Sequence, residues 1–115
     1  MNATNKPTTA HDPADMLATL RIAKTEPRMG GIGGVWVTGT IGDFSFEALA
    51  FADHAACEGY ELGDSRISKL SLRNRRTREC VACFDRGWDR EPATDDARVA
   101  VDLLAAGLAE SIFNK

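Results

Sequence analysis

Hydrophobic and polar residues alternate with a period of two over residues 34–52, which is the clearest pattern in the chain. A Gly-Asp pair at residues 42–43 divides this stretch. Period-two alternation is typical of a β-strand, and glycine supplies the positive φ that a two-residue hairpin turn requires. The pattern predicts a β-hairpin with one face formed by Val35, Val37, Ile41, Phe44, Phe46, Ala48 and Ala50.

Two more strands are predicted over residues 66–74 and 79–85, on either side of a very polar turn. In the first of them, one face is predicted to hold Leu70 and Leu72. The other face is predicted to hold Ile67, Lys69, Ser71 and Arg73. Residues 86–93, which include a glycine and a proline, predict irregular chain.

An amphipathic helix is predicted from residue 94 onward. Thr94 is a suitable N-cap, and two acidic residues follow it in the first turn, where they favour the positive end of the helix dipole. Hydrophobic residues then recur at helical spacing, at Ala97, Val101, Leu104, Leu108 and Ile112. Gly107 lies inside this helix at a cost of about 1 kcal/mol relative to alanine, which predicts a close packing contact there.

The N-terminal part of the chain indicates less structure. Residues 1–11 are polar and predict a disordered tail. An Asp-Pro pair at residues 12–13 predicts the start of a short helix. A brief apolar stripe lies along this helix, which is expected to end before Pro27. The predicted organisation is a tail and short helix over residues 1–29, followed by a single ββββα domain over residues 30–115.

These elements define an α+β fold, a four-stranded antiparallel β-meander with a C-terminal helix packed on one face and a short N-terminal helix. The other face of the sheet would carry the large hydrophobic residues Trp36, Leu49, Phe51 and Ile67. Exposed hydrophobic surface of this size needs a cover, which would be the N-terminal helix, a second subunit or another protein. We therefore expect a homodimer or a binding face.

The composition is that of an ordinary globular domain, with 43% hydrophobic and 27% charged residues in a chain of 115. No apolar run approaches the ~20 residues that span a bilayer, and the polar N-terminus has no apolar segment of the secretory type. We expect a cytoplasmic protein without membrane contact, in which the three cysteines are free thiols.

Charge is distributed unevenly along the chain. The net charge of −3 hides a basic segment, because residues 66–90 hold eight lysines and arginines against three acids. This contrast makes residues 66–90 the main candidate for contacts with a charged partner.

Three short segments have unusual residues in a fixed order. They are residues 34–41 (GVWVTGTI), 66–70 (RISKL) and 85–89 (DRGWD), and a proline and the predicted helix follow them. Together they resemble a group of small proteins of no known activity that phages, plasmids and other mobile elements carry. The resemblance covers roughly residues 34–113 and implies a small domain in a mobile-element setting, without implying an activity.

One pattern has the spacing of a zinc site. His54, Cys57, Cys80 and Cys83 provide four nitrogen or sulfur ligands, each pair separated by two residues. Against this reading, Cys80 and Cys83 fall three residues apart in a predicted strand, where side chains point to opposite faces. Small, buried, hydrophobic thiols are the preferred interpretation, and we expect no metal and no cofactor.

Two catalytic patterns are incomplete. Asp85 and Asp89 flank an Arg-Gly-Trp segment, which suits either general acid–base catalysis or a structural ion-pair corner, and the second is preferred. Thiol catalysis needs a base beside a cysteine, and His54 shares its loop with Cys57 but has no evident residue to orient it. These patterns favour a non-enzymatic protein.

The sequence therefore favours a small accessory domain that interacts with a second copy or with another protein through its sheet face and residues 66–90. The alternative is a single-stranded nucleic-acid-binding module, in which basic groups contact phosphates and aromatic side chains stack on bases. The acidic net charge weighs against this alternative. The candidate binding residues are Arg66, Lys69, Arg73, Arg86, Trp88, Asp85, Asp89 and Trp36.

Overall fold

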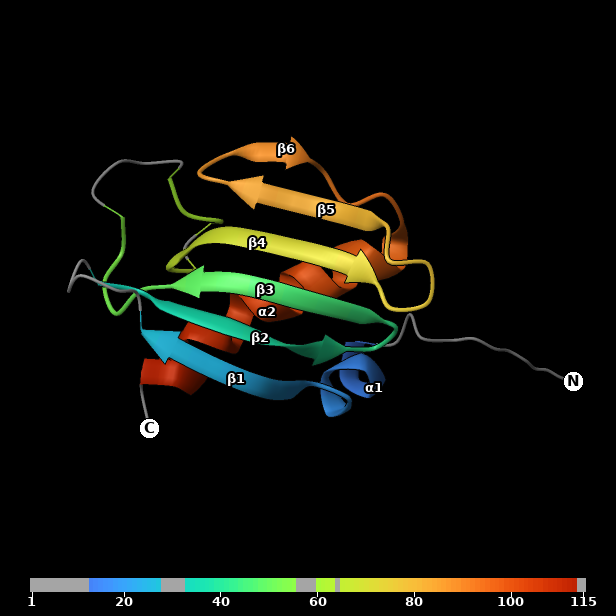
Figure 1. Cartoon of the computed structure of the whole chain (residues 1–115), viewed down its shortest axis with the longest axis horizontal. Coiled ribbons are helices and arrows are strands. Elements are labelled where there is room, and N and C mark those ends of the chain that lie inside the picture. The colour runs from blue at the N-terminus through green and yellow to red at the C-terminus, as the bar shows by residue number, and fades with distance from the viewer. Residues whose placement is uncertain (1–12, 28–32, 56–59, 64, 114–115) are drawn as a thin grey trace, which may run out of the picture.

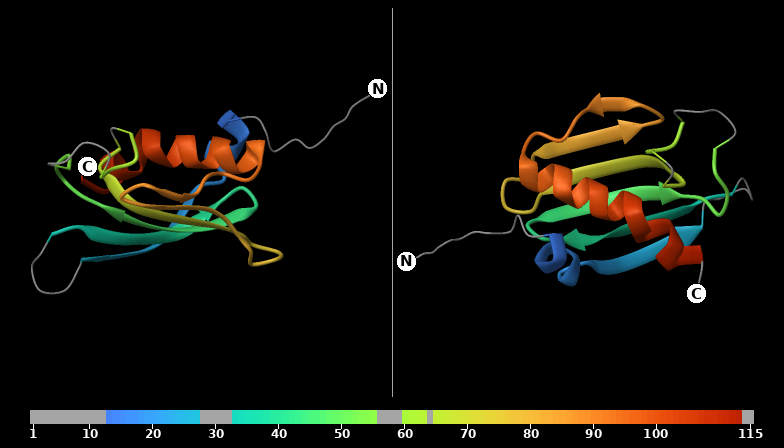
Figure 2. Two further views of the ribbon diagram at one scale, coloured as in Figure 1. Left: turned by 90° about the horizontal axis from the view of Figure 1, so that it is seen from above. Right: turned by 180° about the vertical axis from the view of Figure 1, so that it is seen from behind.

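The computed structural model describes residues 13–27, 33–55, 60–63 and 65–113, which form an α+β fold. Six strands make one antiparallel sheet in the order β1-β2-β3-β4-β5-β6, and both helices lie on the same face of it (Figure 1, Figure 2). The elements are α1 (Pro13–Ala18), β1 (Arg21–Pro27), β2 (Val35–Ile41), β3 (Phe44–Ala50), β4 (Ile67–Asn74), β5 (Cys80–Asp85), β6 (Trp88–Arg90) and α2 (Asp95–Phe113). The predicted antiparallel sheet and C-terminal helix are confirmed, whereas the tail predicted for residues 1–11 lies outside the described residues.

The central hairpin forms as the sequence pattern predicts. Ile41 pairs with Phe44 across a two-residue turn, and Gly42 in that turn has a φ of 57°. The alternating residues of β2 and β3 that were expected to share a face do so, and Val37, Ile41 and Ala48 are fully buried.

Within the described part of the chain the sheet has six strands rather than the predicted four. At one edge, Arg21–Pro27 forms β1 where the sequence predicts the continuation of a helix, and α1 is limited to Pro13–Ala18. All seven residues of β1 are exposed, so no hydrophobic alternation marks this strand, which is held by backbone pairing with β2. At the other edge, β6 has three exposed residues within the stretch predicted as irregular, too few for a period-two pattern.

A β-bulge in β4 changes the face on which Ile67 lies. Leu49 pairs with Lys69 and Ala50 pairs with Ile67, so Ser68 is an extra residue in the strand. The prediction that Ile67 shares a face with Lys69 is therefore wrong, and Ile67 is fully buried in the core.

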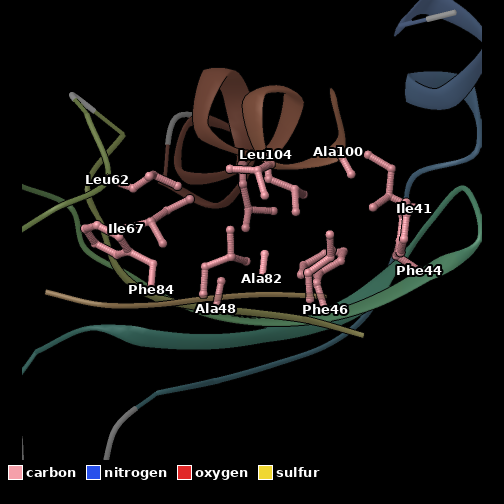
Figure 3. Packing of buried hydrophobic residues seen from close by; sticks show 14 of the residues in the cluster. Ile41, Phe44, Phe46, Ala48, Leu62, Ile67, Ala82, Phe84, Ala100 and Leu104 are labelled. Atoms are coloured by element: carbon pink, nitrogen blue, oxygen red, sulfur yellow. The ribbon is translucent and has the colours of Figure 1, made fainter. Parts of the chain in front are cut away.

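The core lies between α2 and the sheet (Figure 3). The hydroxyl of Thr94 accepts a hydrogen bond from the amide of Ala97 at 3.1 Å, which confirms the predicted N-cap. From the sheet, the core includes Ile41, Phe46, Ala48, Ile67, Leu70, Leu72, Ala82 and Phe84. From the helix, it includes Ala97, Ala100, Val101, Leu104 and Leu108.

The sheet face away from the helices is open (Figure 2). Leu49 lies on this face between its cross-strand partners Trp36 and Lys69, yet it is only 1% exposed. The site of Gly34 lies against the side chains of both Leu49 and Phe51, so neighbouring parts of the same chain cover Leu49. Among the described helices, none has both the length and the apolar character needed to cross a bilayer.

The glycine that permits a close approach is Gly39 rather than Gly107. A Cβ atom at Gly107 would meet nothing within 4 Å, so the packing contact predicted there is absent among the described residues. A Cβ atom at Gly39 would overlap the backbone carbonyl oxygen of Arg21. Gly39 therefore allows β1 to pair with β2 at this point.

Replacing Gly39 with alanine is expected to lower the free energy of unfolding by about 1–3 kcal/mol, because the added methyl group forces β1 away from β2. Gly107→Ala is the matched control, and it should leave stability unchanged or raise it by up to about 1 kcal/mol. Urea unfolding measures both variants, and hydrogen exchange at residues 21–27 reports whether β1 detaches. Equal stabilities for the two variants would contradict the close contact at Gly39.

Candidate functional site

Three connections and a helix end meet at one end of the sheet. In an antiparallel meander alternate connections lie at the same end, so the β1–β2, β3–β4 and β5–β6 connections are neighbours, and the C-terminal end of α2 lies near them (Figure 1). Described residues of these segments line a solvent-open cavity of about 570 Å³, a size typical of ligand sites. Its walls include three basic and three aromatic side chains, Arg66, Lys69, Arg86, Phe51, Tyr60 and Phe113.

Three of the eight predicted binding residues line this cavity, although they come from separate parts of the fold. Arg66 precedes β4, Lys69 lies in β4 and Arg86 lies in the β5–β6 turn. A fourth predicted residue, Asp85, joins them, because its Oδ1 atom lies 3.8 Å from Nζ of Lys69 and 3.5 Å from Nε of Arg86. The structure thus assembles a charged cluster from two segments of the chain, residues 66–69 and 85–86, whose members are 16 to 20 positions apart across the two segments.

The other four predicted residues lie elsewhere. Trp88 lies beside α2 and contacts Phe84 edge to face, with ring centroids 5.2 Å apart. Arg73 lies near the opposite end of β4, where its guanidinium donates a hydrogen bond to the carbonyl of Arg78. Trp36 is half-buried on the open sheet face, and Asp89 is exposed on β6. The predicted residues therefore do not form one surface.

The bulge in β4 positions the cations. The carbonyl of Ser68, the extra residue, accepts a hydrogen bond from the amide of Arg86 at 2.8 Å, which ties the β5–β6 turn to β4. Arg66 and Arg86 both have left-handed backbones, with φ of 63° and 55°. This conformation costs a non-glycine residue about 1–2 kcal/mol. Two of the three cavity cations are therefore held at backbone positions that favour glycine or asparagine.

Glu61 holds the loop wall of the cavity, and the sequence analysis does not single it out. Glu61 is buried and accepts hydrogen bonds from Nδ1 of His54 at 2.7 Å and from the amide of Arg66 at 3.3 Å. Burial alone raises the pKa of Glu61, but the hydrogen bonds from the Ala55 amide, His54 and the Arg66 amide outweigh it and lower the pKa overall. His54 thus has an orienting carboxylate, contrary to the sequence interpretation, and no sequence signal distinguishes this glutamate from a solvated one.

Tyr60 is the second site residue that the sequence analysis misses. Its side chain is 49% exposed at the cavity, and the guanidinium carbon of Arg86 lies 5.9 Å from the centre of its ring. This cation–π contact links the β3–β4 loop to the β5–β6 turn. An exposed tyrosine in a loop has no sequence pattern that marks it.

The residues of the zinc pattern are not brought together. His54 lies at the cavity, whereas Cys80 pairs with Arg73 toward the other end of the sheet, and Cys57 lies outside the described residues. Within the described parts of the chain, no group of three or more His, Cys, Asp or Glu side chains is placed to hold a metal ion.

Cys80 and Cys83 share the open face, although the spacing predicts opposite faces. A bulge in β5 pairs Cys80 with Arg73 and Cys83 with Ser71, and those partners lie on the same face of β4. Burial raises the pKa of the Cys83 thiol, and the neighbouring Cys80, Asp89 and Asp85 add to this effect. The thiolate form is disfavoured, which argues against a nucleophilic role for Cys83.

The family to which the chain belongs is a domain of unknown function, DUF7678, whose model matches residues 35–109. The matched region runs from β2 into α2 and contains all three cavity cations. No curated protein and no solved structure matches the chain.

Glu61→Gln is expected to lower the free energy of unfolding by about 1–2 kcal/mol at neutral pH, because the buried hydrogen bonds lose their charged acceptor. The folded-state pKa of Glu61 lies below its ordinary value of 4.5, so its stabilising contribution is present above that pH. It is lost as the pH falls through the lowered folded-state value. The variant should therefore lose less stability on acidification than the wild type.

Urea unfolding at neutral and acidic pH measures this difference. Glu79→Gln, at an exposed glutamate in the β4–β5 turn, is the matched control and should follow the wild type at both pH values. If Glu61→Gln also follows the wild type, the hydrogen-bond network does not hold the loop.

Proposed function

We propose that this chain is a non-enzymatic interaction domain that binds a segment of a partner protein in the cavity at the strand ends. The observation that carries the proposal is the convergence of Arg66, Lys69 and Arg86 with the exposed ring of Tyr60 on one cavity. Aromatic and arginine side chains are the residues that most often dominate the energy of protein interfaces.

Backbone strain at the cavity supports a role beyond scaffolding. Arg66 and Arg86 keep left-handed backbones that asparagine or glycine would adopt at lower cost. Strained positions persist where the surrounding structure holds them, and they cluster at functional sites. At these two positions the chain presents a cation to the cavity.

Another protein is a better partner than a second copy of this chain. The sequence argument for a homodimer depends on large hydrophobic residues on the open face, and Leu49, at 1% exposed, is already covered within one chain. The cavity lies at one end of that face, where Lys69 adjoins the β5–β6 turn. Self-association stays a prediction that sedimentation tests.

The arrangement of charge also favours a protein over single-stranded nucleic acid. The basic segment divides into cations at the cavity and Arg75, Arg76 and Arg78 in the β4–β5 turn, at opposite ends of the eight-residue strand β4, about 25 Å apart. On the open face, Glu47 lies between these two groups of cations, and Asp85 lies beside Lys69. A strand of nucleic acid is bound best by a continuous basic groove with stacking platforms.

A cytoplasmic location and a mobile-element setting stay predictions of the sequence.

Selection from a displayed library of random dodecapeptides tests the proposal. Peptides that bind the wild type are expected to lose affinity about tenfold or more for Arg86→Asn, because a charged donor is removed. The substitution creates an Asn-Gly pair suited to the turn, so stability should be unchanged or higher, which separates lost binding from unfolding.

Arg78→Asn is the matched control, since Arg78 also has a positive φ, of 69°, but lies at the other end of the sheet. It should leave affinity within about twofold of the wild type, because exposed charges this far apart are screened. A failed selection, or equal losses for the two variants, would contradict the proposal. Tight binding of a twelve-residue oligouridylate that Arg86→Asn weakens would favour the nucleic-acid alternative.

A further inference from the structure

Asp85 lies between two of the cavity cations. One of its oxygens, Oδ1, lies 3.8 Å from Nζ of Lys69 and 3.5 Å from Nε of Arg86. The two nitrogens are therefore no farther apart than the sum of these distances. Asp85 and Lys69 are cross-strand partners, so the sheet itself fixes the carboxylate beside the pair.

Both contacts are loose. Charge-assisted hydrogen bonds between nitrogen and oxygen are about 2.7–2.9 Å long, and both distances exceed this range. The side chains are also accessible, at 39% exposed for Lys69, 41% for Asp85 and 58% for Arg86. Exposed ion pairs of this kind contribute little to stability, so the fold tolerates their exchange.

The surroundings suit a carboxylate attached to a partly apolar chain. Tyr60 and Phe51 line the cavity beside the cations and offer ring surface to carbon atoms. Arg66 adds a third cation, whose Nη1 donates to the carbonyl of Ala52 at 2.9 Å. A guanidinium has five N–H donors, so this bond leaves it capacity for a ligand.

We propose that Asp85 is an internal stand-in for the ligand, and that an aspartate or glutamate carboxylate of an acidic partner segment replaces it on Lys69 and Arg86. The inference rests on the proposed function above. One carboxylate takes the place of another, so the charge beside the two nitrogens does not change. The incoming group forms shorter bonds to both nitrogens, while Asp85 turns toward the solvent.

A carboxylate fits this site better than a phosphate. Asp53 and Glu61 also line the cavity, and both are acidic. They would repel a phosphate, with a charge of roughly −1.5 to −2, more strongly than a carboxylate with a charge of −1. The ligand class is therefore an acidic peptide rather than a phosphorylated one.

Fluorescence anisotropy with a labelled six-residue peptide of alternating glutamate and leucine tests the inference. The wild type should bind this probe more tightly than the glutamine–leucine counterpart, and Lys69→Met should weaken binding about tenfold. Asp85→Asn should tighten binding about three- to tenfold, because the competing carboxylate is removed. Asp89→Asn makes the same charge change on β6 outside the cavity and should alter affinity less than about twofold.

Weaker or unchanged binding by Asp85→Asn would overturn the inference, because Asp85 would then position the cations instead of competing with the ligand. Asp85→Ser serves as a second variant, and thermal unfolding verifies that each variant folds. If the display selection yields peptides that need Arg86 but lack acidic residues, this inference fails and the interaction function stands. If a twelve-residue oligouridylate binds more tightly than the acidic probe and requires Lys69, the ligand is a phosphate and the inference is wrong.

Discussion

One extra residue in β4 determines where the charges of the cavity lie. Because Ser68 is inserted opposite β3, Ile67 turns into the core while Lys69 remains on the open face. The carbonyl of Ser68 also accepts a hydrogen bond from the amide of Arg86, which brings the β5–β6 turn beside Lys69. A shift of register by one residue would expose Ile67 and bury Lys69, so burial of one hydrophobic side chain fixes the whole arrangement.

The loop that completes the cavity is held by buried groups rather than by regular structure. The carboxylate of Glu61 accepts bonds from both sides of the loop, and Leu62 is buried against the core. The amide of Leu62 also donates to the carbonyl of Ile67, next to the bulge. The described wall of the cavity is therefore held by contacts within the chain, and a wall held in this way loses less entropy on binding.

The sequence predicts those parts of the fold in which burial of one face produces a regular pattern of hydrophobic residues. The central hairpin and α2 bury one face each, so their residues alternate with the right period. β1 and β6 are exposed edges held by backbone bonds, which leave no periodic signal. The bulge at Ser68 also leaves no signal in the sequence, because one inserted residue changes the face on which its neighbours lie without changing the composition of the strand. The count of charges along the chain identifies Arg66, Lys69 and Arg86 as candidates. Only the fold shows that they lie apart from Arg73 and from the β4–β5 turn.

Left-handed arginines alone do not identify the site, since Arg78 has the same conformation in the β4–β5 turn. What distinguishes Arg66 and Arg86 is that a bulge, a buried glutamate and an aromatic wall bring them to one cavity with Lys69. If the turn after Asp85 served only the fold, an Asn-Gly pair would form it with less backbone strain and without a cation. Arginine at this position places a charged donor beside a carboxylate that contacts it only loosely. Such an exposed ion pair adds little to the stability of the fold, whereas a ligand that forms shorter bonds to the arginine adds more to the free energy of binding.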